Sequence, residues 1–191
     1  MNSLRSFSIY LLLIGFLSCQ RSFHVPNKKP LLEDTHYSAL VAGTVGTESP
    51  LAAIRFQGEG RVLKSIRVGT TGNPDFLIIQ CLEFTFTESG TEQTVHLGRL
   101  EGATFSPPFI APAASPLIGI SGRGGWYVDA IKFHFANGSE TELYGGAGGD
   151  TTYDLAITQD AEGGWKGAVW GLYGNADPFV ETLGLIFEAI E

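Results

Sequence analysis

Two glycine-rich loops carry the residues best suited to hold a ligand. The first loop reads Gly125, Trp126, Tyr127, Val128, Asp129, and the second reads Gly145, Gly146, Ala147, Gly148, Gly149. An ionised aspartate accepts strong, charge-assisted hydrogen bonds. Glycine has no Cβ, so the N–H groups of a glycine turn can approach a ligand closely. An acceptor in one loop and donors in the other favour binding through hydrogen bonds.

The two loops also have less specific interpretations. Asp is common in turns, so residues 125–129 taken alone fit a plain hairpin loop as well. The run GGAGGD is similar to a calcium-binding glycine–aspartate repeat, but such repeats come in tandem and the sequence has one copy. No strand–helix–strand unit is predicted around either loop, which argues against a dinucleotide site.

The sequence shows no pattern that indicates a metal, a cofactor or a nucleophilic enzyme. The four histidines, His24, His36, His96 and His134, lack the spacing of metal ligands. There is no G-x-S-x-G motif, and no Ser or Cys has a base partner that can be identified from the sequence. We therefore expect no metal, no cofactor and no catalytic residue.

Period-two patterns predict that strands position the two loops. Ile118 and Ile120 alternate with small residues, and residues 130–135 alternate small or polar with large apolar side chains. Asn137-Gly138 is a strong hairpin signal, because type I′ turns need positive φ at both central residues. A third strand is predicted over residues 139–144. Two strand reversals then separate the loops, which places both at the same end of a sheet.

The string ISGRGGWYVDAI, followed by a strand, a turn and YGGAGG, resembles the jacalin-related lectins. The resemblance implies an all-β fold, the β-prism I, with three four-stranded antiparallel sheets and pseudo-threefold symmetry. It also implies a carbohydrate-binding module for mannose/glucose-type or galactose-type glycans. In that reading Asp129 accepts hydrogen bonds from the sugar, and the backbone N–H groups of Trp126, Tyr127 and Gly149 donate them. The ring of Trp126 or Tyr127 would lie against the C–H face of the sugar.

Three internal repeats agree with a threefold prism. The copies span residues 62–90, 116–138 and 164–191, and each reads as a strand, a glycine-rich loop and a second strand. The position that opens the second strand holds Gln80, Asp129 and Glu181. Members of the family carry the intact Gly-x-x-x-Asp in the last repeat, whereas this chain carries it in the second. Either the site has moved to the second repeat, or the chain is permuted relative to the family.

The N-terminus predicts export. Arg5 precedes an apolar run over residues 9–17, which is typical of a signal peptide over residues 1–18. The sequence FLSC resembles a bacterial lipobox, which implies lipidation at Cys19 and a membrane-anchored lipoprotein; the alternative is an ordinary secreted protein. Residues 19–36 read as the lipidated N-terminus and a linker, and residues 37–191 as the β-prism domain. Lipidation would leave Cys81 without an intrachain partner, and we expect its side chain to be buried.

The excess of acidic over basic residues limits the partners that we expect. A formal net charge of −8 argues against nucleic-acid binding, which needs basic patches. Glycans or glycoconjugates, together with a membrane through the lipid anchor, are the partners that we expect, and the sequence leaves the oligomeric state open. Two alternatives remain beside the lectin: a prism whose sugar site has decayed and which serves as a structural or protein-interaction module, and a glycoside-active enzyme. The enzyme is the least favoured, because it needs two carboxylates facing each other across a cleft.

Overall fold

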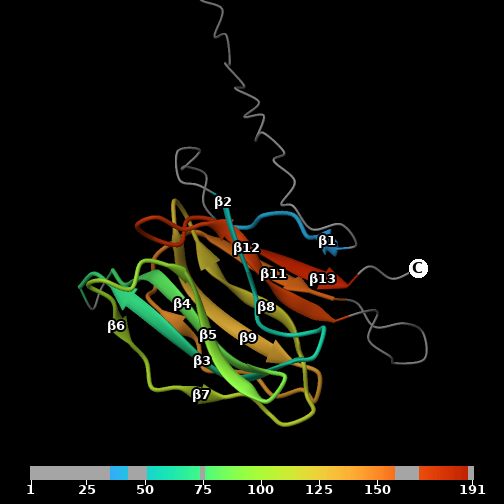
Figure 1. Ribbon diagram of the computed structural model, residues 1–191. Coiled ribbons are helices and arrows are strands. Elements are labelled where there is room, and N and C mark those ends of the chain that lie inside the picture. Colours follow the sequence, from blue (N-terminus) through green and yellow to red (C-terminus); the bar gives the residue numbers. More distant parts are fainter. Residues whose placement is uncertain (1–34, 43–50, 74–75, 158–167, 189–191) are drawn as a thin grey trace, which may run out of the picture.

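Three antiparallel sheets make up the described part of the chain (Figure 1). The computed structural model describes residues 35–42, 51–73, 76–157 and 168–188. The first sheet has the order β1 (Thr35–Tyr37), β13 (Gly184–Glu188), β12 (Val169–Asn175), β2 (Leu51–Arg55). The second has the order β10 (Tyr144–Gly145), β9 (Val128–Phe135), β8 (Leu117–Gly124), β11 (Thr151–Ala156).

The third sheet contains five strands. Its order is β5 (Thr91–Gly98), β4 (Ile78–Glu88), β3 (Arg61–Thr71), β6 (Thr104–Phe105), and β7 (Phe109–Ile110) also pairs with β3. The all-β prediction is therefore confirmed, and each predicted repeat supplies the central hairpin of one sheet. The described ranges include no helix that could cross a membrane. The predicted signal peptide, Cys19 and most of the linker lie outside the described residues, although β1 already begins at Thr35.

The third sheet has five strands because its fourth position is split in two. β6 pairs with β3 at Gly69 and Thr70, and β7 pairs with the same strand at Ser65 and Ile66. Pro107 and Pro108 lie between these segments, and proline cannot donate a ladder hydrogen bond. Prolines thus divide one edge strand into two short segments.

A second difference concerns the strand expected over residues 139–144. It pairs with β9 only near its ends, through an isolated bridge at Glu140 and through the two residues of β10. Between them the backbone N–H of Phe133 donates to the Thr141 hydroxyl at 3.1 Å, so a side chain replaces a ladder partner. The irregular segment leaves Leu143 exposed, at 51%.

Hydrogen bonds around one axis relate the three repeats to one another. The backbone N–H of Val128 donates to the carbonyl of Val180 at 2.8 Å, and the N–H of Val180 donates to the carbonyl of Ile79 at 3.0 Å. All three side chains have 0% exposure. Each comes directly before the position that opens the second strand, so Gln80, Asp129 and Glu181 are structurally equivalent. The same end of the prism therefore carries all three candidate loops.

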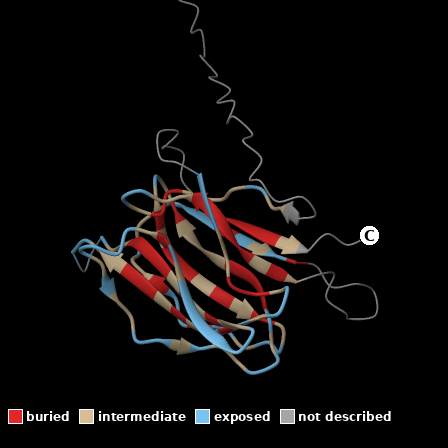
Figure 2. Ribbon diagram, viewed as in Figure 1, coloured by how far each residue is buried: buried red, intermediate tan, exposed pale blue. Residues whose placement is uncertain are grey.

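One core joins the three sheets. Phe56 follows β2, Phe84 lies on β4 and Phe133 lies on β9, and all three are fully buried. The rings of Phe56 and Phe84 stack at 4.0 Å, and Phe84 meets Phe133 edge-on at 5.8 Å. Buried and partly exposed residues alternate along much of β9 (Figure 2), as expected for a strand of a sheet with one face on a core. Cys81 is also fully buried in this core, as predicted.

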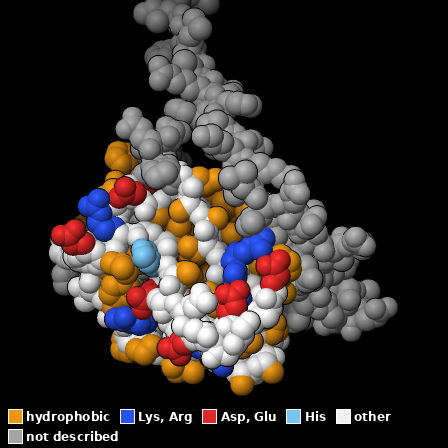
Figure 3. Space-filling view, viewed as in Figure 1, with side chains coloured by type: hydrophobic (Ala, Val, Ile, Leu, Met, Phe, Trp, Pro, Cys, Tyr) orange, Lys and Arg blue, Asp and Glu red, His pale blue; other side chains and the backbone are white. Residues whose placement is uncertain are grey.

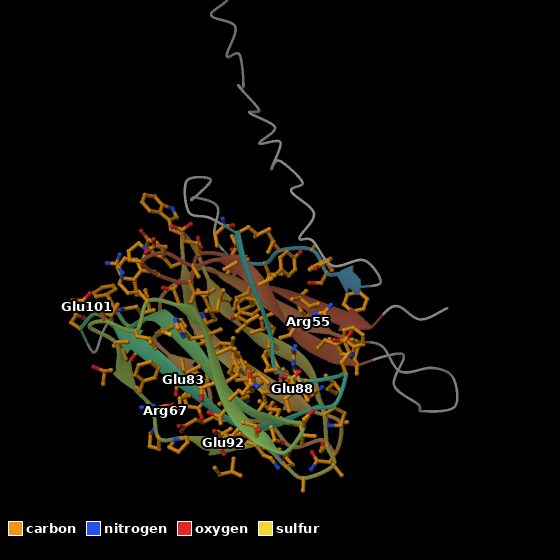
Figure 4. All side chains as sticks on the ribbon, viewed as in Figure 1. Arg55, Arg67, Glu83, Glu88, Glu92 and Glu101 are labelled. Atoms are coloured by element: carbon orange, nitrogen blue, oxygen red, sulfur yellow. The ribbon has the colours of Figure 1, made fainter. Side chains whose placement is uncertain are left out.

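The outer faces carry charges of both signs. In the face shown in Figure 3, acidic and basic side chains are interspersed. On the third sheet Arg67 pairs with Glu83 at 3.0 Å, and Figure 4 shows both on neighbouring strands. Glu92 lies on β5 of the same sheet.

Candidate functional site

The loop that precedes β9 has an exposed tip between buried ends. Val128 is fully buried, and the Tyr127 ring meets the Phe179 ring of the third repeat edge-on at 5.2 Å. Trp126 stands out from the surface with 67% exposure. The N–H of Gly125 donates to the carbonyl of Tyr127 at 3.0 Å, which tightens the turn. The loop is thus held from below and presents an aromatic side chain to solvent.

The second loop is held directly against the first residues of β9. Gly145 pairs with Ala130, and the N–H of Gly146 donates to the carbonyl of Asp129 at 2.9 Å. Gly145 has φ of +105°, and a Cβ there would lie 2.1 Å from the Asp129 carbonyl oxygen. Only glycine fits this position, so the sequence of the turn sets its approach to the strand that carries Asp129.

The carboxylate of Asp129 lies against the far end of the glycine turn. A Cβ on Gly148 would lie 2.3 Å from Asp129 Oδ1, and a Cβ on Gly149 would lie 2.6 Å from Oδ2. Gly125 is on the other side, where a Cβ would be 3.9 Å from Oδ2. The structure therefore brings the two glycine-rich loops together around one carboxylate. The strand reversals predicted that both loops lie at the same end of the sheet, whereas the role of Asp129 was implied only by the resemblance.

Burial and neighbouring charges set the electrostatics of this carboxylate. Burial raises the pKa of Asp129 above that of an ordinary aspartic acid. A hydrogen bond from the Gly125 backbone and the positive charge of Arg123 lower the pKa, and the negative charge of Asp150 raises it. The guanidinium Nη2 of Arg123 also donates to the Gly149 carbonyl at 2.7 Å.

Arg123 is the residue of this site that sequence reasoning missed. It faces outward on β8, two residues before Gly125, and spans to the glycine turn. The period-two pattern of the strand predicts that its side chain is on the solvent face. The sequence gives no indication that this side chain turns toward Gly149.

The two loops beside the carboxylate also contain backbone donors. Within the described part of the chain, the N–H groups of Trp126, Tyr127, Gly148 and Gly149 donate to no backbone carbonyl. These N–H groups could donate hydrogen bonds to a ligand while Asp129 accepts hydrogen bonds from the same ligand. A partly buried setting strengthens such bonds. Among the described residues, no group of three or more His, Cys, Asp or Glu side chains could hold a metal ion.

The equivalent position of the first repeat is occupied differently. Gln80 is 4% exposed, and its amide nitrogen donates to the carbonyls of Arg99 at 3.1 Å and Glu101 at 2.5 Å. Those carbonyls belong to the turn that corresponds to residues 145–149. Gly98 lies against the backbone carbonyl of Gln80, just as Gly145 lies against the backbone carbonyl of Asp129. The side chain of Gln80 therefore binds its own turn.

The equivalent position of the third repeat is buried. Glu181 is buried, with 8% exposure, whereas Asp129 is only partly buried. Its glycine turn falls mainly within residues 43–50, which lie outside the described part of the chain. Of the three equivalent positions, the second repeat thus presents the accessible carboxylate.

Several solved structures similar to this chain are lectins. The Calystegia sepium agglutinin matches with a TM-score of 0.62 and 18% identity, covering 83% of this chain and 99% of that one. A mannose-binding jacalin-related lectin from Ananas comosus matches with a TM-score of 0.58 and 17% identity, over 83% and 100% of the two chains. An artocarpin–mannotriose complex matches with a TM-score of 0.61 and 14% identity, over the same shares.

No protein-family model matches the sequence, and no curated protein matches it. The likeness to the solved lectins covers almost the whole of each of them. This chain has the β-prism fold of the jacalin-related lectins.

Proposed function

We propose that this chain is a lectin that binds a neutral hexose of a glycan between residues 125–129 and 145–149. The observation that carries the proposal is the Asp129 carboxylate, which lies against Gly148 and Gly149. Backbone N–H groups of both loops donate to no backbone carbonyl in the described protein. Adjacent hydroxyls of a hexose both donate and accept hydrogen bonds, so they fit an acceptor flanked by donors. Trp126, which is exposed at the rim, offers an apolar face to the C–H side of the ring.

The affinity for one hexose should be weak. A shallow site makes a handful of hydrogen bonds, each worth roughly 0.5–1.5 kcal/mol net. After the cost of immobilising the sugar, the dissociation constant should be on the order of 1 mM. Useful affinity would come from many copies of the protein meeting a polyvalent glycan.

A glycan array tests the proposal, with the chain from Gln20 onward so that β1 stays intact. We expect signals on neutral hexose glycans of the mannose/glucose type or the galactose type. Several similar structures are lectins, and two of them are described as mannose-binding, which makes mannose-type glycans the first to try. A blank array together with no response to millimolar hexose in solution would contradict the proposal.

One observation favours a second candidate function. Gln80 binds its own turn and Glu181 is buried, so two of the three equivalent positions present no open acceptor. A prism that has lost its sugar sites and serves as a structural or protein-interaction module would show the same features. Such a module would give the blank array, and replacing Asp129 would change nothing that can be measured with sugars.

We also propose that the protein is displayed on a membrane surface through a lipid on Cys19. Support comes from the sequence alone, which has a signal-peptide pattern ending in FLSC. The full chain produced in a bacterium should incorporate a palmitate analogue and partition into detergent. Cys19→Ala should abolish both, and labelling that survives this replacement would exclude Cys19 as the site of the lipid.

A further inference from the structure

A shallow hollow on the outer face of the second sheet lies next to the proposed sugar site. Its volume is about 580 Å³, and residues of β8, β9 and β11 line it, together with Glu140 and Leu143. Asp154 of β11, Ser121 of β8 and Lys132 of β9 face one another across the three strands. The hollow is therefore part of the rigid sheet that carries Asp129.

Arg123 belongs to both the hollow and the sugar site. It lines the hollow two residues along β8 from Ser121. Its guanidinium donates to Gly149 in the glycine turn, and its charge acts on Asp129. Residues on the same face of a strand are about 7 Å apart at this spacing. A ligand held at Asp129 and longer than one sugar would therefore reach the hollow directly.

Four polar side chains of the hollow already contact one another. Ser121 Oγ and His134 Nε2 are 2.7 Å apart, and His134 Nδ1 lies 3.4 Å from Glu140 Oε2. Lys132 Nζ donates to Glu140 Oε1 at 2.6 Å. Binding would require little further ordering of these groups, which reduces the entropy cost of recognition.

The order Ser–His–Glu is also that of a hydrolytic triad, and sequence reasoning did not foresee it. β8, however, is a central strand that pairs with β9 on one side and β11 on the other. Its N–H groups near Ser121 are thus used in the ladders, and an acyl-transfer site needs free donors for the oxyanion. The network fits recognition of hydroxyl groups better than catalysis.

Charge indicates the class of ligand. With His134 neutral, the cations Arg123 and Lys132 balance the anions Glu140 and Asp154 in the lining. A balanced lining favours neither a polyanion nor a polycation. Donors and acceptors are both present, and the exposed Leu143 adds an apolar surface. This combination suits the hydroxyls and C–H faces of neutral sugars.

We propose that the hollow binds the further sugar residues of a neutral oligosaccharide whose first hexose is held at Asp129. This inference rests on the proposed function and adds that the protein reads a chain of sugars rather than a single hexose. At least two additional hydrogen bonds should make a linear trisaccharide bind on the order of tenfold more tightly than the monosaccharide.

Calorimetric titration of the full chain tests this with methyl α-mannoside, methyl α-galactoside and a linear trisaccharide of each hexose. Two variants change the hollow: Asp154→Ala removes an acceptor, and Ser121→Tyr fills the space. Both should keep the affinity for the monosaccharide and lose the roughly tenfold gain for the trisaccharide. Glu92→Ala, an exposed carboxylate on the third sheet, is the matched control and should change neither value.

The outcomes separate the two proposals. A monosaccharide that binds as tightly as its trisaccharide overturns the role of the hollow and leaves the lectin function standing. The role of the hollow also fails if the gain survives in both Asp154→Ala and Ser121→Tyr. If wild-type protein binds none of the four sugars, the proposed function itself fails, and the inference about the hollow falls with it.

Discussion

The ionisation of Asp129 should govern how sugar binding depends on pH. Its raised pKa means that the carboxylate protonates at a higher pH than an ordinary aspartic acid. Protonation removes the charged acceptor, so affinity should fall on acidification with a midpoint above the ordinary range for Asp. Titrations with sugar at a series of pH values above the acid-unfolding transition would measure the midpoint. A midpoint at or below the ordinary value, or no change with pH, would contradict this role.

The raised pKa of Asp129 also affects stability. The direction of this effect is opposite to that of a salt-bridged carboxylate, whose pKa is lowered by folding. Because the pKa of Asp129 is raised in the folded state, its contribution is fully favourable below the unfolded pKa and is lost as pH rises through the folded value. Ionised Asp129 therefore costs stability at neutral pH. Asp129→Asn should be at least as stable as wild type there, which thermal melts can check, so lost binding would not reflect unfolding.

At the scale of single residues, the sequence could place Asp129 and the glycines but not their neighbours. Strand reversals bring residues 125–129 and 145–149 to one end without knowledge of side-chain rotamers. Arg123, in contrast, reaches Gly149 through a long flexible side chain, whose direction depends on the assembled surface. The contact between Ser121 and His134 depends on the register of the hairpin, and irregularities at Leu117/Gly119 and Arg123/Gly124 shift that register.

At the scale of elements, a methyl group added to the glycine turn should weaken sugar binding more than it lowers the stability of the fold. Gly148 has no left-handed backbone, but a Cβ there would lie 2.3 Å from Asp129 Oδ1. Gly148→Ala should therefore displace the carboxylate and lose sugar binding, while the free energy of unfolding changes by about 1 kcal/mol or less. Chemical denaturation and sugar titration of the same variant would measure both effects.

Gly138→Ala is the control for this turn. Gly138 has φ of +83° and open space around it. It lies in the hairpin turn after β9, at the opposite end of that strand from Asp129. Alanine should cost about 1–2 kcal/mol of backbone strain there and leave binding intact. The account of the glycine turn is wrong if Gly148→Ala binds sugar normally or if Gly138→Ala is the variant that loses binding.

Elements were predicted well where alternation and turn signals agree, and less well at the sheet edges. The central hairpins of the three repeats follow from alternating apolar residues and turn residues. The divided edge of the third sheet depends on where Pro107 and Pro108 fall relative to β3, which sequence alone does not give. The segment before β10 is irregular because the Thr141 side chain replaces a backbone partner, and no period-two pattern reports such a substitution.

At the scale of the whole molecule, one core should make the three sheets unfold together. Phe84 contacts Phe56 and Phe133 and so links residues from all three sheets. Phe84→Ala should lower the free energy of unfolding by about 3–5 kcal/mol and keep a single transition. Phe76→Ala, at a position that is 69% exposed, should stay within about 0.5 kcal/mol of wild type. Two separate transitions, or similar costs for both variants, would argue against a shared core.

The chemical differences between the three repeats appear only in the assembled molecule. The sequence aligns Gln80, Asp129 and Glu181 correctly, because the repeats share a pattern of strand, loop and strand. It does not show that Gln80 binds the carbonyls of its own turn or that Glu181 is buried. These outcomes depend on how each turn packs against its neighbours in the assembled prism.

The most direct test of the account compares sugar titrations of wild type, Asp129→Asn and Asp177→Asn. Asp177 lies on the equivalent loop of the third repeat and is exposed, so its replacement removes the same charge from the same end of the molecule. Calorimetric or NMR titration with the hexose that gives the strongest array signal should show millimolar binding for wild type and for Asp177→Asn. Asp129→Asn should lose at least tenfold in affinity while melting at or above the wild-type temperature. Unchanged binding by Asp129→Asn, or loss in Asp177→Asn alone, would show that the sugar site is not at the second repeat.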